Sequence, residues 1–128
     1  MHLDVGGALV FVPFAVLSTV VHELGHVAGG RFAGFPAKSY VLGSFGRVHS
    51  ETPTTPRALL LLTASGPLAG LLYGLVLVSL APVTAPVGAA GVWAIAAGVT
   101  NVVPWPANSD GRKTWRAARD LAQRPDLA

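Results

Sequence analysis

Three long apolar segments dominate this chain of 128 residues and constrain its fold more than any other feature. They cover about residues 5–30, 58–80 and 85–103, and as helices each could cross roughly 30 Å of hydrocarbon. Hydrophobic residues make up 52% of the chain and charged residues only 12%, whereas a soluble domain has about a quarter of its residues charged. We therefore expect an all-α integral membrane protein, with three transmembrane helices forming a single domain over residues 1–128.

Basic residues predict the orientation of these helices. All nine Lys and Arg residues lie on one side of the expected topology: Arg31, Lys38, Arg47 and Arg57 between the first two segments, and Arg112, Lys113, Arg116, Arg119 and Arg124 after the third. The positive-inside rule then predicts a multi-pass protein with its N-terminus outside and its C-terminus in the cytoplasm. The net charge of +3 reports this orientation, so we expect no nucleic-acid partner. No Lys or Arg precedes the first segment, so we do not expect a cleaved signal peptide.

A His-Glu-x-x-His motif, formed by His22, Glu23 and His26, lies near the cytoplasmic end of the first apolar segment. Two histidines four residues apart on a helix can reach one metal ion, and a glutamate beside them can exchange protons with water. An ionised group within a bilayer costs about 2.5–3.5 kcal/mol at the helix centre, and a zinc ion bound by the histidines would offset that cost. The chain has no cysteine, which leaves His, Asp and Glu as ligands.

Asp110 is the best candidate for a third ligand, because it follows the third apolar segment and should lie at the depth of His22 and His26. Its alternative role is that of a turn residue or helix cap beside Gly111. The weaker candidates are His49 and Glu51 in the loop, His2 and Asp4 on the opposite side of the membrane, and Asp120 and Asp126 in the charged tail.

The connections and the tail complete the expected fold. Residues 35–50 are glycine-broken and predict a short β-hairpin or re-entrant loop that packs near the mouth of the site. Gly66, Gly70 and Gly74 recur every four residues and predict a helix-packing face. The tail, residues 109–128, predicts a basic interfacial helix.

Three motifs together resemble the conserved core of the site-2 protease family of intramembrane zinc metalloproteases. They are His22–His26 in the first segment, Ser65–Gly70 in the second, and Asn101–Pro104 followed by Asp110 and Gly111 after the third. The resemblance implies one catalytic Zn²⁺ bound by His22, His26 and Asp110, with Glu23 as general base and acid. It implies hydrolysis of peptide bonds in transmembrane protein or peptide substrates near the cytoplasmic face.

The same resemblance implies where a substrate binds. Asn101 would help to hold the substrate or the developing oxyanion, although an interhelical hydrogen bond is its alternative role. The loop formed by Gly43, Ser44, Phe45 and Gly46 would clamp an unwound substrate strand by strand addition.

The chain departs from the family pattern in three ways. Gly70 stands where family members commonly have Asn, the Asn101–Asp110 interval is one residue longer than in the tightest motif, and no auxiliary domain is evident. One alternative is therefore a catalytically inactive member of the same fold that acts as a membrane-protein binding or assembly factor. Another is a small metal-handling membrane protein. Beyond the lipid bilayer, we expect a second copy of the chain or a membrane partner to cover its lipid-facing surfaces.

Overall fold

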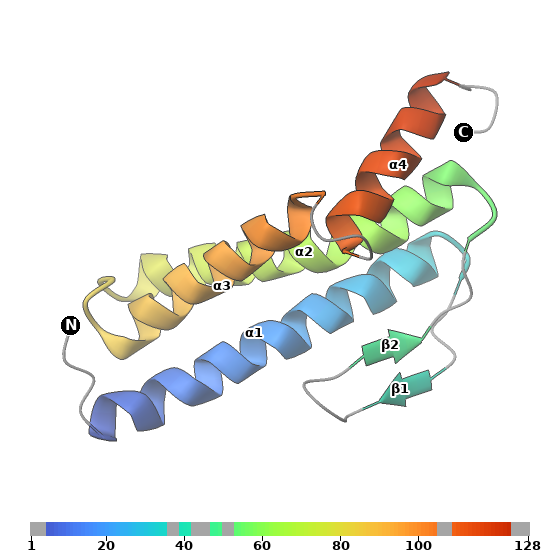
Figure 1. Ribbon diagram of the computed structural model, residues 1–128. Helices are drawn as coiled ribbons and strands as arrows, with labels where there is room; N and C mark the ends of the chain where they lie inside the picture. The colour runs from blue at the N-terminus through green and yellow to red at the C-terminus, as the bar shows by residue number, and fades with distance from the viewer. Residues whose placement is uncertain (1–4, 36–38, 42–46, 50–52, 105–108, 124–128) are drawn as a thin grey trace.

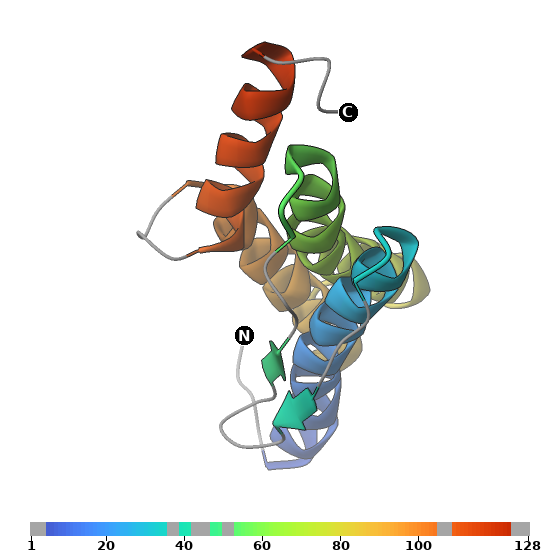
Figure 2. The same cartoon turned by 90° about the vertical axis from the view of Figure 1, so that its right-hand side faces the viewer.

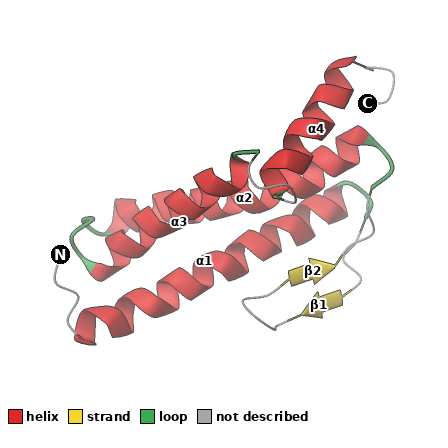
Figure 3. Cartoon of the chain, viewed as in Figure 1, coloured by secondary structure: helices red, strands yellow, loops and turns green. Residues whose placement is uncertain are grey.

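Four helices make up most of the protein, as the all-α prediction requires (Figures 1 and 3). The computed structural model describes residues 5–35, 39–41, 47–49, 53–104 and 109–123. Its elements, in chain order, are α1 (Val5–Phe32), β1 (Ser39–Val41), β2 (Arg47–His49), α2 (Pro56–Leu80), α3 (Pro86–Val102) and α4 (Asp110–Gln123). The three apolar segments became α1, α2 and α3, and each predicted boundary is within two residues of the observed one. Among the described residues, α1 and α2 are long and apolar enough to cross a membrane, whereas α3 has 17 residues.

Local chemistry explains where the two long helices end and begin. Gly34 adopts a left-handed backbone with φ of 78°, the Phe35 N–H donates to the Gly30 carbonyl, and the Gly34 N–H donates to that of Arg31. This is a Schellman motif, which closes the C-terminal end of α1 and needs a residue that tolerates positive φ. Thr55 caps α2 by accepting a hydrogen bond from the Ala58 N–H, and Pro56 fills the first helical position.

Small residues allow the helices to approach closely. Helix α2 packs extensively against both α1 and α3, while α1 and α3 contact each other less (Figure 2). A Cβ atom at Gly25 of α1 would lie 2.7 Å from Cβ of Ala69 in α2, and one at Gly74 of α2 would lie 2.9 Å from the Ile95 nitrogen of α3. The glycine stripe of α2 therefore lies on a packing face, as predicted. A larger residue at Gly74 would separate α2 from α3, whereas a Cβ atom at Gly70 would make only ordinary contacts.

Large apolar side chains point outward from this glycine- and alanine-rich interior. Leu9 of α1 is 71% exposed, Leu72 of α2 is 55% exposed and Trp93 of α3 is 56% exposed, whereas Ala90 and Ala94 are buried. A soluble protein rarely exposes so large an apolar area. Small residues inside and large apolar residues outside are the arrangement of helices that face lipid.

The two strands and α4 flank the bundle on opposite sides (Figures 1 and 2). Strands β1 and β2 pair antiparallel, with Tyr40 opposite Val48, and β2 contacts α1. This pair lies within the segment for which a hairpin or re-entrant loop is predicted, and Gly43–Gly46, which come between the two strands in the sequence, are outside the described residues. Helix α4 packs on α2 and brings its first residue, Asp110, toward α1.

Candidate metal centre

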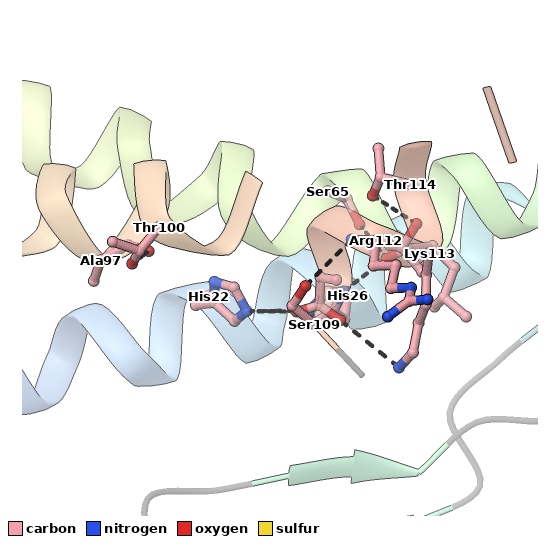
Figure 4. Close-up of polar contacts among 12 residues, drawn as sticks. His22, His26, Ser65, Ala97, Thr100, Ser109, Arg112, Lys113 and Thr114 are labelled. Carbon is pink, nitrogen blue, oxygen red and sulfur yellow. Dashed lines mark hydrogen bonds and ion pairs between the residues drawn. The ribbon is translucent and has the colours of Figure 1, made fainter. Parts of the chain in front are cut away.

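Asp110, which is far from His22 and His26 in the sequence, meets their side chains at the C-terminal half of α1. His22 Nε2 lies 3.1 Å from His26 Nε2, and the Asp110 Oδ2 atom lies 3.3 Å from the first and 3.1 Å from the second. Figure 4 shows both imidazoles projecting from α1 toward the first turn of α4. The structure therefore brings together the three residues that the sequence offered as ligands, and this group could hold a metal ion.

Helix α2 fixes the orientation of His26. The His26 Nδ1 atom lies 2.6 Å from the Leu62 carbonyl oxygen, which can only accept, so Nδ1–H is the donor. In the neutral ring, Nε2 then carries the lone pair that faces His22 and Asp110. A hydrogen bond of this kind to the far nitrogen is typical of metal-binding histidines, because it fixes the tautomer and the ring plane.

Glycine at position 66 makes room for the same ring. A Cβ atom there would lie 2.7 Å or less from three ring atoms of His26, which no side chain could accommodate without moving the ring. At Gly70, one helical turn later, a Cβ atom would meet Nδ1 of His22 at 3.8 Å, an ordinary contact. The two glycines therefore have different roles, since only Gly66 is required by the position of an imidazole.

Asp110 reaches the histidines because α4 begins at that residue. Ser109 takes the capping position, where its hydroxyl oxygen accepts a hydrogen bond from the Arg112 N–H. Asp110 is therefore the first helical residue, and its carboxylate faces α1, so the cap role proposed as an alternative belongs to Ser109. Lys113 Nζ lies 4.0 Å from the other carboxylate oxygen, Oδ1.

The surroundings of Asp110 favour its ionised form. Burial raises the pKa of its carboxyl, but the hydrogen bonds and charges of the His22 and His26 rings outweigh burial and hold that pKa well below its ordinary value. The group is thus a carboxylate at neutral pH, which is the form that binds metal ions.

The geometry of the three ligand atoms fits a zinc ion. Tetrahedral zinc with bonds of about 2.0–2.1 Å has ligand atoms about 3.3–3.4 Å apart, close to the separations of 3.1–3.3 Å seen here. At 3.1 Å, His26 Nε2 and Asp110 Oδ2 are joined by a proton when no metal is bound, and a cation held by the lone pairs of both atoms would take the place of that proton. Two imidazoles and one carboxylate are also a ligand set that zinc accepts.

A cavity of about 440 Å³ opens beside this group, between α1 and α3. Glu23 and Asn101 line it together with His22 and Asp110, so the predicted general base and the predicted substrate-binding amide share one space with two of the ligands. The other predicted substrate-binding residues, Gly43, Ser44, Phe45 and Gly46, lie outside the described residues. His49 belongs to β2, and Glu51 is also outside the described residues.

Several cavity residues were not predicted from the sequence. They are Ser18, Thr19, Trp93, Ala97 and Ser109. Helical spacing could have indicated some of them. Ser18 and Thr19 lie one turn before His22 and Glu23, and so on the same face of α1. Ala97 and Trp93 lie one and two turns before Asn101 on α3. The Leu62 carbonyl that orients His26 had no such signal, since it is a backbone group.

The chain matches no protein-family model, and no curated protein or solved structure is significantly similar to it.

Proposed function

We propose that this protein is an intramembrane zinc metalloendopeptidase, similar to the site-2 protease family, that hydrolyses peptide bonds of transmembrane substrates near the cytoplasmic face. One observation carries the proposal. The ligand atoms of His22, His26 and Asp110 form a triangle of the size that zinc requires, and Glu23 lines the cavity beside them. The helix α1, which carries both histidines and Glu23, is long enough to cross a membrane. An HExxH helix with a third ligand and an adjacent cavity is the arrangement of a catalytic rather than a structural zinc site.

The proposed topology has three spans. Helix α3 has 17 residues, which is at the lower limit of the range for a membrane span, and its outward Trp93 and Val99 are apolar. The C-terminal end of α1, the start of α2 and all of α4 lie at one end of the bundle (Figure 1). Among the residues whose exposure the structure describes, the exposed basic ones at that end are Arg31, Arg57, Arg112, Lys113, Arg116 and Arg119. Their one-sided distribution supports a cytoplasmic location for the metal centre.

Each residue of the centre has a proposed role. His22, His26 and Asp110 would hold the ion, and the chemistry that zinc supplies when bound is Lewis acidity toward water and a peptide carbonyl. Glu23 accepts a proton from the attacking water and later donates it to the departing amine. Asn101, whose amide can donate hydrogen bonds, holds the substrate carbonyl as negative charge develops on its oxygen.

We further propose that the β1–β2 pair receives the substrate. A transmembrane helix must unwind before its peptide bonds are accessible, and an unwound segment can pair with an exposed strand edge. Strand β2 of this pair contacts α1, which is the helix that carries His22, Glu23 and His26. A second copy of the chain or a membrane partner would cover the lipid-facing side of the bundle.

The test is cleavage of transmembrane peptides by the purified full-length chain in liposomes, together with measurement of its zinc content. Glu23→Gln should keep stoichiometric zinc and lower the cleavage rate by about 10²- to 10⁴-fold, because it removes the proton acceptor and little else. Asp120→Asn, which neutralises an acidic residue of α4 that does not line the cavity, should cleave at the wild-type rate.

Two outcomes would contradict the proposal. Cleavage that survives in Glu23→Gln would exclude the proposed chemistry, and purified protein without zinc would exclude the proposed cofactor. Stoichiometric zinc without cleavage of any transmembrane peptide would instead favour the catalytically inactive alternative, a binding or assembly factor with the same fold.

A further inference from the structure

Helix α4 is held in one position by contacts that also determine where Asp110 lies. The Thr114 hydroxyl donates to the buried Thr63 hydroxyl of α2 at 2.9 Å, and Thr63 in turn donates to the Leu59 carbonyl at 2.8 Å. Ala117, one turn further along, is fully buried. A Cβ atom at Gly111 would collide with the last carbonyl groups of α3, so the start of α4 lies directly against that helix. The carboxylate reaches the histidines only while α4 is docked in this way.

The opposite face of α4 is basic and exposed. Arg112, Arg116 and Arg119 follow at intervals of four and three residues, so they form one stripe on the side of the helix that faces away from Thr114 and Ala117. We call these three residues the arginine stripe. Figure 1 shows α4 leaving the bundle obliquely, and all three residues of the arginine stripe are exposed.

A tryptophan lies beside the arginine stripe. The Trp115 indole N–H donates to the Val102 carbonyl at the end of α3, at 3.2 Å, while 57% of the residue is exposed. Tryptophan with a fixed polar end and an exposed ring is typical of the membrane–water interface, and arginine beside it favours anionic headgroups. Asp120 is the acidic residue of α4 besides Asp110, so the exposed part of the helix is strongly positive.

We propose that anionic lipid headgroups bind the arginine stripe and thereby raise the metal affinity of the His22–His26–Asp110 centre. This inference rests on the proposed function, because it assigns a regulator to the same site. Lipid that binds the docked helix more tightly than the undocked one must favour docking, and docking supplies the third ligand. Metal and lipid binding are then coupled, and each strengthens the other by the same factor.

The docked helix is the better lipid ligand for two reasons. An isolated helix of 14 residues is marginal in water, so undocking would disperse the arginine stripe as the helix frays. In addition, the face that α4 turns toward the end of α3 and toward α2 contains the small residues Gly111, Thr114 and Ala117. Leu121, four residues after Ala117, adds one large apolar side chain to this face, so undocking leaves a single such side chain there to insert into lipid.

Zinc titration of the full chain in vesicles tests this inference. We would compare phosphatidylcholine vesicles with vesicles containing about one third phosphatidylglycerol, a density at which juxtamembrane basic residues bind the surface. An anionic surface also concentrates Zn²⁺, so the decisive comparison is between the wild type and Arg112→Gln/Arg116→Gln/Arg119→Gln in the same vesicles. Lys113 is left unchanged because it lies near the Asp110 carboxylate. In anionic vesicles the wild type should bind zinc about fivefold or more tightly than the triple variant, a typical coupling, and in neutral vesicles equally well.

Spin-label distances provide a readout that does not depend on metal. The chain has no cysteine, so labels can be placed at Thr54→Cys, before α2, and Gln123→Cys, at the end of α4. In anionic vesicles, the distribution of distances between the two labels should narrow when the arginine stripe is intact and remain broad in the triple variant. Arg57→Gln, which removes an exposed charge from α2 at the same end of the bundle, should behave like the wild type in both experiments.

Three outcomes are decisive. Equal zinc affinities for wild type and triple variant in anionic vesicles would overturn the inference, as would an equal effect of inorganic phosphate in neutral vesicles, which would assign the stripe to a free anion. The distance distribution between the spin labels could narrow as expected while the protein binds no zinc in any vesicle. That result would support docking of α4 by anionic lipid and would contradict the proposed function.

Discussion

The two faces of α1 differ in how tightly they are packed. Toward α2, Gly25 lies so close to Ser65 and Ala69 that a single added methyl group would collide. Toward α3, the helix borders two hollows, the cavity of about 440 Å³ and an apolar groove of about 420 Å³. The groove is lined by Phe11, Val12, Ala15, Val16, Thr19 and Trp93. The helix is therefore fixed from one side and accessible from the other.

This difference separates positioning from chemistry. His26 is oriented from the packed side by the Leu62 carbonyl and by the space above Gly66, whereas His22 and Glu23 line the open side. Under the proposed function, the packed face holds the ligand His26 in a fixed orientation, whereas the accessible face presents Glu23 and the ligands His22 and Asp110 to the substrate. Thr19 and Trp93 line both hollows, so the apolar groove continues into the polar cavity.

The largest effect is expected from a methyl group on the packed face. Gly66→Ala would place Cβ against the His26 ring and displace its Nε2 atom, so zinc affinity should fall by about 10- to 100-fold, as for other changes that disturb the support of a metal ligand. Gly70→Ala is the matched control, because its Cβ would meet His22 at 3.8 Å and should leave the affinity unchanged. Isothermal titration with Zn²⁺ in detergent measures both. Equal affinities for the two variants would remove the distinction between the faces.

A bulky residue on the open face should have a smaller effect, on turnover alone. Ala97 of α3 lines the cavity, and Ala97→Phe would fill part of it without approaching the α1–α2 contact. We expect peptide cleavage to fall by about tenfold through misplaced substrate, with zinc affinity and unfolding unchanged. Ala96→Phe adds the same ring on the exposed side of α3 and serves as the control. A loss of zinc from Ala97→Phe would show that the open face also positions the ligands.

The sequence predicted the parts of the molecule that depend on periodicity and on residue type. Apolar length located α1, α2 and α3, and the four-residue spacing of His22 and His26 placed them on one face. Asp110 could be paired with them only by its expected depth and by the resemblance of its surrounding motif to site-2 proteases, because a single acidic residue next to glycine equally predicts a turn. The distinction between Gly66 and Gly70 was not predictable, since both belong to one stripe and differ only in which imidazole lies opposite. The position of α4 depends on two threonine hydroxyls, on the buried Ala117 and on the close approach of Gly111 to α3, and such residues are too common to form a recognisable pattern.

The smallest effect should come from a single hydrogen bond on the packed face, far from the metal centre. The Tyr73 hydroxyl of α2 donates to the Phe14 carbonyl of α1 at 3.2 Å, about two turns before His22. Tyr73→Phe should lower the free energy of unfolding by about 0.6 kcal/mol, the average found for interhelical hydrogen bonds in a membrane protein. Ser79→Ala is the control, because the Ser79 hydroxyl bonds only within α2, to the Val76 carbonyl. Unfolding in mixed micelles measures the energies, and zinc titration should give the wild-type affinity for both variants. If Tyr73→Phe weakened zinc binding as much as Gly66→Ala, the packed face would act as one cooperative unit, and the role assigned to Gly66 would be too local.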